Sequence, residues 1–271
     1  MAERIAFIGG GNMASAIIGG LIQQGHCSSC FDVLEPSIEA RQKLKQAFNI
    51  DAREQSGDFL SAAALIVWAI KPQVFAQAAK AVALHCSDAL HLSVAAGIHS
   101  DSIALWLGSQ RIVRAMPNTP ALIGRGITGL FARNGVSFSD KTRIEQVITT
   151  TGEMLWLATE AQLDVVTALS GSGPAYVFYF MEAMIAAGTE MGLRREQAQQ
   201  LALATFAGAS ALALSSSEPP QVLRQRVTSK GGTTHAAISA MENDDVRSLF
   251  INAMYAARQR AHELGEEFGK P

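Results

Sequence analysis

The sequence predicts an α/β protein in two parts, a helix-covered parallel sheet over residues 1–160 and an all-helical part over residues 161–271. Up to about residue 160, short apolar runs alternate with longer segments of helical periodicity. Such runs are typical of strands that are buried on both faces of a parallel sheet. From Ala161 onward the segments are long, alanine-rich and helical in period, without strand-like alternation.

The first part is expected to alternate strands with helices. Its predicted strands are Arg4–Ile8, Phe31–Leu34, Ala64–Ala69, Leu90–Val94, Arg111–Met116, Gly126–Phe131 and Met154–Leu157. Its helices are expected to begin near Asn12, Ser37, Gln73 and Ser100, with a further one over Asp140–Thr150. We therefore expect the sheet to continue past residue 120.

The second part is expected to contain only helices. They are predicted at Gln162–Leu169, Pro174–Met191, Arg195–Leu214, Gln221–Val227, Thr233–Glu242 and Asp245–Glu267. Small residues such as Ala183, Ala187, Ala204 and Gly208 let helix backbones approach closely. This pattern suits a helical domain that is shared between subunits.

Composition excludes several classes of protein. The 271 residues are 48% hydrophobic, which is ample for a buried core and excludes a disordered chain. The formal net charge of −2 offers no basic surface for nucleic acid or an anionic membrane. Three cysteines cannot build a disulfide framework, so we expect the reducing cytoplasm. We expect neither a signal peptide nor a membrane span, because Leu201–Leu214 is shorter than the roughly 18 residues required.

A glycine-rich turn follows the first predicted strand. Gly9, Gly11 and Ala14 form a GxGxxA pattern that opens a helix. Gly9 permits the tight turn, Gly11 leaves room for a pyrophosphate, and Ala14 lets the helix pack close to the strand. Such a turn can also be a simple connection, but its place between a first strand and a second strand that ends in an acid favours dinucleotide binding.

The acid at the end of the second strand bears on the choice of cofactor. Glu35 lies 24 residues after Gly11, where a carboxylate accepts hydrogen bonds from an adenosine ribose, which favours NAD. Ser37 and Arg41 follow at the next helix start and could receive a 2′-phosphate. The choice between NADH and NADPH therefore stays open, as does a plain surface-loop role for Glu35.

Two further turns follow predicted strands. Lys71 and Pro72 lie just beyond the third strand, at the sheet edge where ligands bind in open α/β sheets. The segment Arg114–Pro120 ends another strand with a rigid polar loop. Either turn can also be purely structural.

Two polar loops interrupt the helices of the second part. In Leu169–Tyr176, Ser172 or Gly173 is expected to cap the helix that Pro174 opens. In Val227–His235, a Gly-Gly pair enters a helix between hydroxyl groups. Its backbone N–H groups suit a small anion such as a carboxylate, the alternative being a simple helix cap.

In order and spacing, the segments FIGGGNMA, IKPQ, RAMPNTP, LSGSGPAY and VTSKGGTTHAAISAME resemble the pyrroline-5-carboxylate reductase family. The resemblance implies a Rossmann-like amino-terminal domain and an all-helical carboxyl-terminal dimerisation domain. It implies reduction of 1-pyrroline-5-carboxylate to L-proline by NADPH or NADH, the last step of proline biosynthesis. It also implies a homodimer, extending to a ring of dimers, with each active site between one subunit's cofactor domain and its partner's helices.

The resemblance also implies roles for single residues. Those at the cofactor would be Gly9, Gly11, Asn12 and Met13 on the pyrophosphate, Ala69, Lys71, Pro72, Ala95, Ala96 and Gly97 along ribose and nicotinamide, and Asn118 beside the nicotinamide. Those at the substrate would be Glu160, Ser229, Gly231, Gly232, Thr233 and Thr234. The Thr234 hydroxyl would be catalytic at the ring nitrogen, orienting it or relaying a proton from water. Glu35 and Ser56, both expected near the adenosine, differ from the residues common there in relatives.

Other readings compete with this one. A β-hydroxyacid dehydrogenase or imine reductase would use a lysine on a long helix, and no lysine lies between Lys141 and Lys230. A non-catalytic NAD(P) sensor would be expected to lose the Gly231–Thr234 loop. His26, Cys27 and Cys30 suggest a metal or redox pair, but a four-ligand zinc set is missing, so we expect an ordinary loop and no metal.

Overall fold

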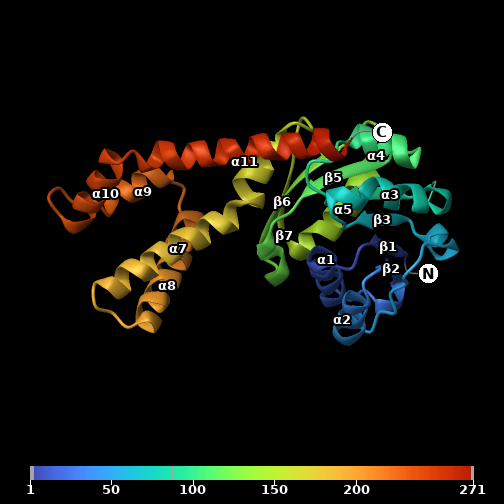
Figure 1. Cartoon of the computed structure of the whole chain (residues 1–271), viewed down its shortest axis with the longest axis horizontal. Coiled ribbons are helices and arrows are strands. Elements are labelled where there is room, and N and C mark those ends of the chain that lie inside the picture. Colours follow the sequence, from blue (N-terminus) through green and yellow to red (C-terminus); the bar gives the residue numbers. More distant parts are fainter. Residues whose placement is uncertain (1–2, 87, 270–271) are drawn as a thin grey trace. The chain divides into compact units, whose positions relative to one another are not determined.

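The computed structural model describes residues 3–86 and 88–269 (Figure 1). Seven strands form one sheet in the order β2-β1-β3-β4-β5-β6-β7. They are β1 (Ile5–Ile8), β2 (Phe31–Leu34), β3 (Leu65–Trp68), β4 (Leu90–Ser93), β5 (Ile112–Met116), β6 (Gly126–Ala132) and β7 (Gly152–Trp156). The predicted α/β class and all seven predicted strands are confirmed.

The sheet is parallel except at one pair of strands. β6 runs antiparallel to β5, and β7 then pairs with β6 in parallel. β1 lies between β2 and β3, so the chain passes from β1 to β2 on one side of it and then crosses to β3 on the other side. The carboxyl ends of β1 and β3 therefore form a topological switch point, where open α/β sheets bind their ligands.

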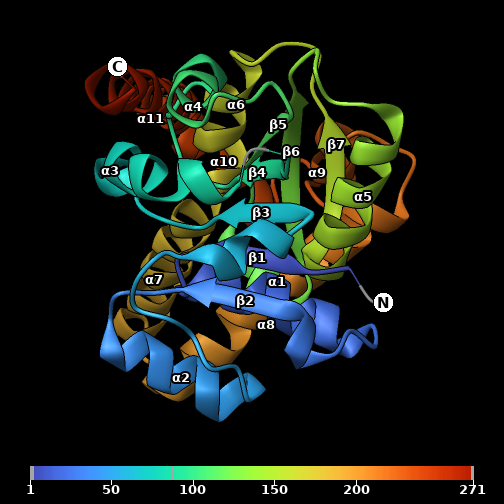
Figure 2. The same cartoon turned by 90° about the vertical axis from the view of Figure 1, so that its right-hand side faces the viewer.

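Helices cover both faces of this sheet (Figure 2). They are α1 (Asn12–Gln23), α2 (Ile38–Phe48), α3 (Pro72–Val82), α4 (Ser100–Leu107), α5 (Phe138–Ile148) and α6 (Gln162–Val166). Phe7 belongs to a core with α1 and α5, whereas its neighbours Ala6 and Ile8 belong to a core with α3 and α4. β1, β2, β3 and β4 are buried along their whole length, which confirms the prediction of strands buried on both faces for them. It is wrong for the edge strand β7, where Glu153 and Leu155 are exposed.

Five further α-helices follow within the described residues. They are α7 (Gly173–Glu190), α8 (Arg195–Ser215), α9 (Pro220–Arg226), α10 (Thr233–Asn243) and α11 (Val246–Phe268). The chain forms two compact units, Gly173–Tyr255 and a sheet unit made of Met1–Ser172 with Ala256–Pro271. Within the described residues, no helix combines the length and apolar character needed to cross a lipid bilayer.

The segment expected to be a capped turn before α7 is instead helical. Thr167–Gly171 forms a π-helical turn directly after α6. The Ser172 N–H donates to the Thr167 carbonyl oxygen at 2.8 Å, five residues back. A Cβ at Gly171 would lie 2.5 Å from Cε of Met116, so the wide turn packs against the side chain of the last residue of β5. The expected cap by Ser172 or Gly173 is therefore wrong.

Candidate functional site

Gly9 forms the tight turn between β1 and α1. Its φ of +95° lies in a region that favours glycine. A Cβ at this position would lie 2.5 Å from the Ala69 carbonyl oxygen and 2.7 Å from Cγ2 of Ile70. The Gly9 N–H also donates to the Leu34 carbonyl oxygen at 2.8 Å. The turn is therefore held between the ends of β2 and β3, and only glycine fits it.

Gly11 has the opposite surroundings. No heavy atom lies within 4 Å of the place where its Cβ would stand. It is the N-cap residue of α1, and it makes no side-chain hydrogen bond to the first N–H groups of that helix. Those N–H groups, together with the helix dipole, offer a site for an anion such as a pyrophosphate.

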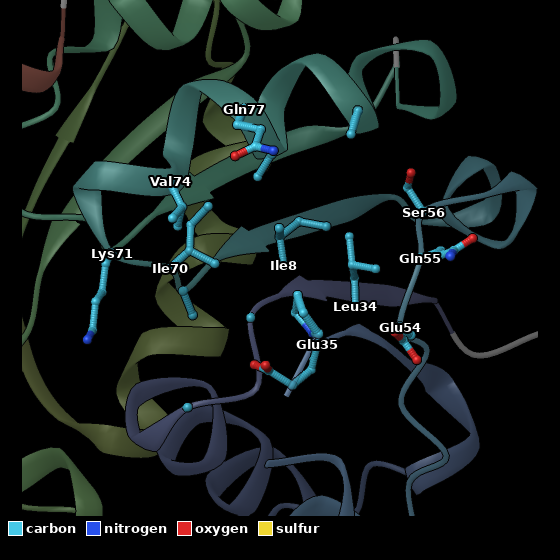
Figure 3. A pocket seen from close by; sticks show the side chains of 16 residues that line it. Ile8, Leu34, Glu35, Glu54, Gln55, Ser56, Ile70, Lys71, Val74 and Gln77 are labelled. Atoms are coloured by element: carbon cyan, nitrogen blue, oxygen red, sulfur yellow. The ribbon is translucent and has the colours of Figure 1, made fainter. Parts of the chain in front are cut away.

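A cavity of about 840 Å³ lies at this turn (Figure 3). It is lined by Ile8, Gly9, Gly11, Leu34, Glu35, Pro36, Glu54, Gln55, Ser56, Ala69, Ile70, Lys71, Val74, Gln77, Ala78 and Ala81. Figure 3 shows Lys71 at one end and Glu54, Gln55 and Ser56 at the other. The cavity thus brings together six of the residues expected at the cofactor, namely Gly9, Gly11, Glu35, Ser56, Ala69 and Lys71.

The remaining expected cofactor residues are not among those that line the cavity, but they lie on adjoining turns. Asn12 and Met13 form the first turn of α1, and Pro72 is the first residue of α3. Asn118 follows β5, and its Oδ1 accepts the Ile127 N–H at 3.0 Å. Ala95, Ala96 and Gly97 follow β4.

A glycine is needed at position 97 because of packing within the sheet unit. Its φ is +76°, and a Cβ there would lie 3.0 Å from the Gly265 nitrogen and 3.2 Å from the Ala261 carbonyl oxygen. The last turns of α11 thus pack directly on the loop after β4. The glycine at position 97 is required by that contact, whatever its part in cofactor binding.

The substrate residues expected between Ser229 and Thr234 lie at the start of α10. Gly231 has a φ of +75°, and the Gly232 N–H donates to the Ser229 carbonyl oxygen at 3.0 Å. Gly232 is the N-cap residue and makes no side-chain hydrogen bond to the helix. Ser229, Gly231 and Thr233 are exposed, and Thr234 is half-buried. This helix start can accept a small carboxylate on its backbone N–H groups.

Glu160, the other expected substrate residue, belongs to a network inside the sheet unit. Its carboxylate accepts the Ser100 N–H and hydroxyl, both at 2.6 Å, and pairs with Arg114 Nη1 at 2.7 Å. Burial raises the pKa of Glu160, but the Arg114 charge and these hydrogen bonds outweigh it, so that the pKa is lowered. The carboxylate thus stays ionised and supports the start of α4.

Several cavity residues were missed by the sequence reasoning. Val74, Gln77, Ala78 and Ala81 lie at helical spacing on one face of α3, a pattern that was available in the sequence. Glu54 and Gln55 show no such pattern. They reach the cavity because Arg53 pairs with β2, its N–H donating to Val33 at 2.7 Å and its carbonyl accepting from Glu35 at 2.8 Å.

Cys27 is exposed and Cys30 is buried at the end of a short helical turn before β2. Across residues 3–86 and 88–269, no group of three or more His, Cys, Asp or Glu side chains is arranged to hold a metal ion.

Comparison with known proteins gives matches along most of the chain. Residues 160–264 match the family described as pyrroline-5-carboxylate reductase dimerisation, and residues 4–97 match NADP oxidoreductase coenzyme F420-dependent. The pyrroline-5-carboxylate reductase of Pseudomonas aeruginosa is 44% identical over 98% of each chain.

Solved structures agree with these sequence matches. A pyrroline-5-carboxylate reductase from Coxiella burnetii superposes with a TM-score of 0.89 at 38% identity, covering 97% of this chain and 99% of that one. Pyrroline carboxylate reductase from Plasmodium falciparum, solved with NADP bound, has a TM-score of 0.87 at 28% identity, covering 97% and 98%.

Proposed function

The chain belongs to the pyrroline-5-carboxylate reductase family, and on that premise we propose which residues carry the reduction of 1-pyrroline-5-carboxylate to L-proline. This reaction is the last step of proline biosynthesis and consumes NADPH or NADH. The observation that carries the assignment of roles is the cavity beside Gly11, which joins an uncapped helix start to the carboxyl ends of β1 and β3.

The cofactor residues are those that the resemblance implies. Gly9, Gly11, Asn12 and Met13 hold the pyrophosphate at the start of α1. The space at Gly11 supports this, since a side chain there would enter the cavity. Glu35, Ser37 and Ser56 lie towards the adenosine. Residues of the three further turns border ribose and nicotinamide, namely Ala69, Lys71, Pro72, Ala95, Ala96, Gly97 and Asn118.

The substrate residues are those at the start of α10. Backbone N–H groups from Ser229 to Thr233 bind the substrate carboxylate, and the Thr234 hydroxyl meets the ring nitrogen. The bound reduced nicotinamide supplies a hydride to the carbon of the C=N bond. Thr234 orients the nitrogen or passes it a proton from water, because an alcohol is too weak an acid to be the source. Protonation makes the imine carbon more electrophilic, and the nitrogen becomes the amine of L-proline.

For Glu160 we propose a positioning role. The resemblance puts it beside the substrate, and its carboxylate already holds Ser100 and Arg114. It fixes the start of α4, directly after the loop of Ala95, Ala96 and Gly97.

We propose that residues 1–160 serve the cofactor and residues 161–271 serve dimerisation and the substrate. The chain forms oligomers through its dimerisation domain. Large apolar side chains that stand exposed on α7 and α8, among them Phe178, Tyr179, Leu212 and Leu214, would be covered in a dimer. A ring of dimers is the larger assembly that we propose, and light scattering on the purified protein tests it against a mass of twice 28.8 kDa.

The cytoplasm is the proposed location. Cys27, Cys30 and Cys86 are free thiols, which suits a reducing compartment. Fractionation of cells that carry the tagged protein tests this.

The activity test is initial-rate oxidation of NADPH and NADH by the purified protein, with and without 1-pyrroline-5-carboxylate. We expect oxidation that depends on the substrate, with L-proline as the product. If neither cofactor is oxidised although both bind, the chain is a cofactor sensor and the proposed site roles are wrong.

A further inference from the structure

Glu35 carries a negative charge that is fixed in place at the cofactor cavity. Its Oε2 accepts the Gly10 N–H at 2.7 Å, and its Oε1 accepts the Ser37 N–H at 2.8 Å. One bond comes from the turn before α1 and the other from the start of α2. Because both oxygens are held by backbone groups, the carboxylate cannot swing away from an incoming ligand. Each oxygen keeps a lone pair with which it can accept a ribose hydroxyl.

Arg41 is the cation that could balance a phosphate here, but its guanidinium is already engaged. Nη1 donates to the carbonyl oxygens of Glu35 at 2.9 Å and Pro36 at 2.8 Å. Nη2 pairs with Glu54 Oε2 at 3.2 Å. Arg41 therefore closes the turn between β2 and α2, and its charge is already opposed by Glu54.

The charge at this end of the cavity is consequently negative. Of the described residues that line it, Glu35, Glu54 and Lys71 are charged, and Lys71 lies at the end opposite Glu54 (Figure 3). The neighbouring Arg53 stacks its guanidinium over the Phe59 ring at 4.3 Å. Because Glu54 is paired with Arg41, the repelling charge is that of Glu35, which has no ion-pair partner among the described residues. A phosphate dianion beside Glu35 would meet like charge at short range.

We propose that this chain selects NADH over NADPH, with Glu35 accepting the adenosine ribose hydroxyls and excluding a 2′-phosphate. The proposal rests on the cofactor site proposed above and adds the choice between the two nucleotides. Glu35 sets the preference directly. Glu54 contributes by keeping Arg41 engaged.

Binding of the two nucleotides without substrate gives the first test. Isothermal titration calorimetry of the full-length protein with NADH and with NADPH is expected to show NADH bound about tenfold more tightly, or more. Equal affinities, or tighter binding of NADPH, would overturn the proposal. The measurement does not depend on turnover, so a protein that binds NADH but reduces no imine would refute the proposed function and leave this preference standing.

Two variants localise the effect. Glu35→Ser is expected to shift the NADPH-to-NADH affinity ratio by about tenfold towards NADPH, because the fixed charge is gone. Glu54→Gln releases Arg41 and is expected to raise NADPH affinity about threefold, with NADH unchanged. Since Glu35→Ser also removes two hydrogen bonds from the turn, Glu54→Gln carries the test if the first variant does not fold. An unchanged ratio in Glu54→Gln, or in a folded Glu35→Ser, would contradict the mechanism.

Glu39→Gln is the matched control. Glu39 is exposed in the first turn of α2 and is not among the cavity residues, so removing its charge should leave the ratio unchanged. Arg41→Ala in the Glu54→Gln background provides a second control. We expect it to abolish the gain in NADPH affinity, because the released Arg41 is the cation that produces that gain. A gain that persists without Arg41 would contradict the mechanism.

Discussion

Two helices of this protein begin at glycine-rich turns, and the surroundings of those turns differ. The turn before α1 is enclosed, since Gly9 lies against Ala69 and Ile70, and Glu35 holds the Gly10 N–H. The turn before α10 is open, since Gly231 has no heavy atom within 4 Å of its missing Cβ. Contacts within the sheet unit thus fix the conformation of the first turn. No such contacts surround Gly231 in the second turn.

The difference separates two requirements for a glycine. At Gly9 both the conformation and the space exclude a side chain, whereas at Gly231 only the conformation disfavours one. The cofactor turn should therefore be preformed in the folded chain. The substrate turn should depend for its order on what binds there, including the partner subunit that the proposed assembly supplies.

The largest expected effect compares these two glycines directly. Gly9→Ala should lower the free energy of unfolding by about 3 kcal/mol and abolish cofactor binding, because the methyl group overlaps the Ala69 carbonyl. Gly231→Ala should cost only about 1 kcal/mol, the conformational penalty alone. Urea unfolding of both variants measures this. Equal losses would mean that the substrate turn is as tightly enclosed as the cofactor turn.

Glu160→Gln tests a residue of the sheet unit. The resemblance puts Glu160 at the substrate, but its hydrogen bonds and its ion pair are structural. Arg114 is 4% exposed and would lose its counter-charge, so we expect stability to fall by about 3 kcal/mol. KM for 1-pyrroline-5-carboxylate should stay nearly unchanged at a temperature where the variant is folded. A raised KM with unchanged stability would show instead that Glu160 contacts the substrate.

Features set by local contacts could be predicted from the sequence, whereas those set by long-range contacts could not. The strand Phe31–Leu34 was predicted to the residue, because a buried parallel strand needs a nearly continuous apolar run. The fifth helix was predicted from Asp140 but begins at Phe138, because Ser137 and Asp140 form a reciprocal cap. A strand or helix of this kind can be recognised in a sequence, although the exact residue at which the helix begins depends on its cap.

Long-range contacts were not readable in the same way. Glu54 reaches the cavity only through the pairing of Arg53 with β2. The spacing that suggested Glu35 as a ribose ligand did not indicate its hydrogen bonds to Gly10 and Ser37. It also did not indicate the ion pair between Arg41 and Glu54. The choice of nucleotide therefore stayed open in the sequence and became arguable only from the structure.

Thr234→Val tests the open turn, with an expected effect on rate rather than on stability. Loss of the hydroxyl should lower kcat about a hundredfold, since orientation of the ring nitrogen and proton relay are lost together. NADH affinity and the urea midpoint should not change, because Thr234 lies on α10 and not at the cavity. Thr233→Val, one residue earlier and exposed, keeps the backbone N–H that is proposed to bind the carboxylate and loses only a hydroxyl, so it is the matched control for the Thr234 hydroxyl. A similar loss in the control would mean that the turn as a whole, rather than the Thr234 hydroxyl, carries the effect.

The smallest expected effect concerns β4, which pairs with β3, one of the two strands that hold the first turn. His91 on β4 is buried, and its Nδ1 accepts the Trp68 Nε1–H at 3.2 Å. Burial, assisted by the positive charge of Arg111, lowers the pKa of His91 to about 4. An unfolded chain takes up this proton near its ordinary pKa of about 6.5, so stability is lost as pH falls from there towards 4.

Between pH 7 and pH 5.5 this linkage should remove about 1 kcal/mol of unfolding free energy. His91→Gln keeps an acceptor for Trp68 but cannot titrate, so its loss over the same interval should be smaller by that amount. Val67→Ala, a core variant on the adjacent strand without a titrating group, should keep the wild-type dependence. If His91→Gln retained the full pH dependence of stability, the acid sensitivity of the sheet unit would come from another titrating group and not from His91.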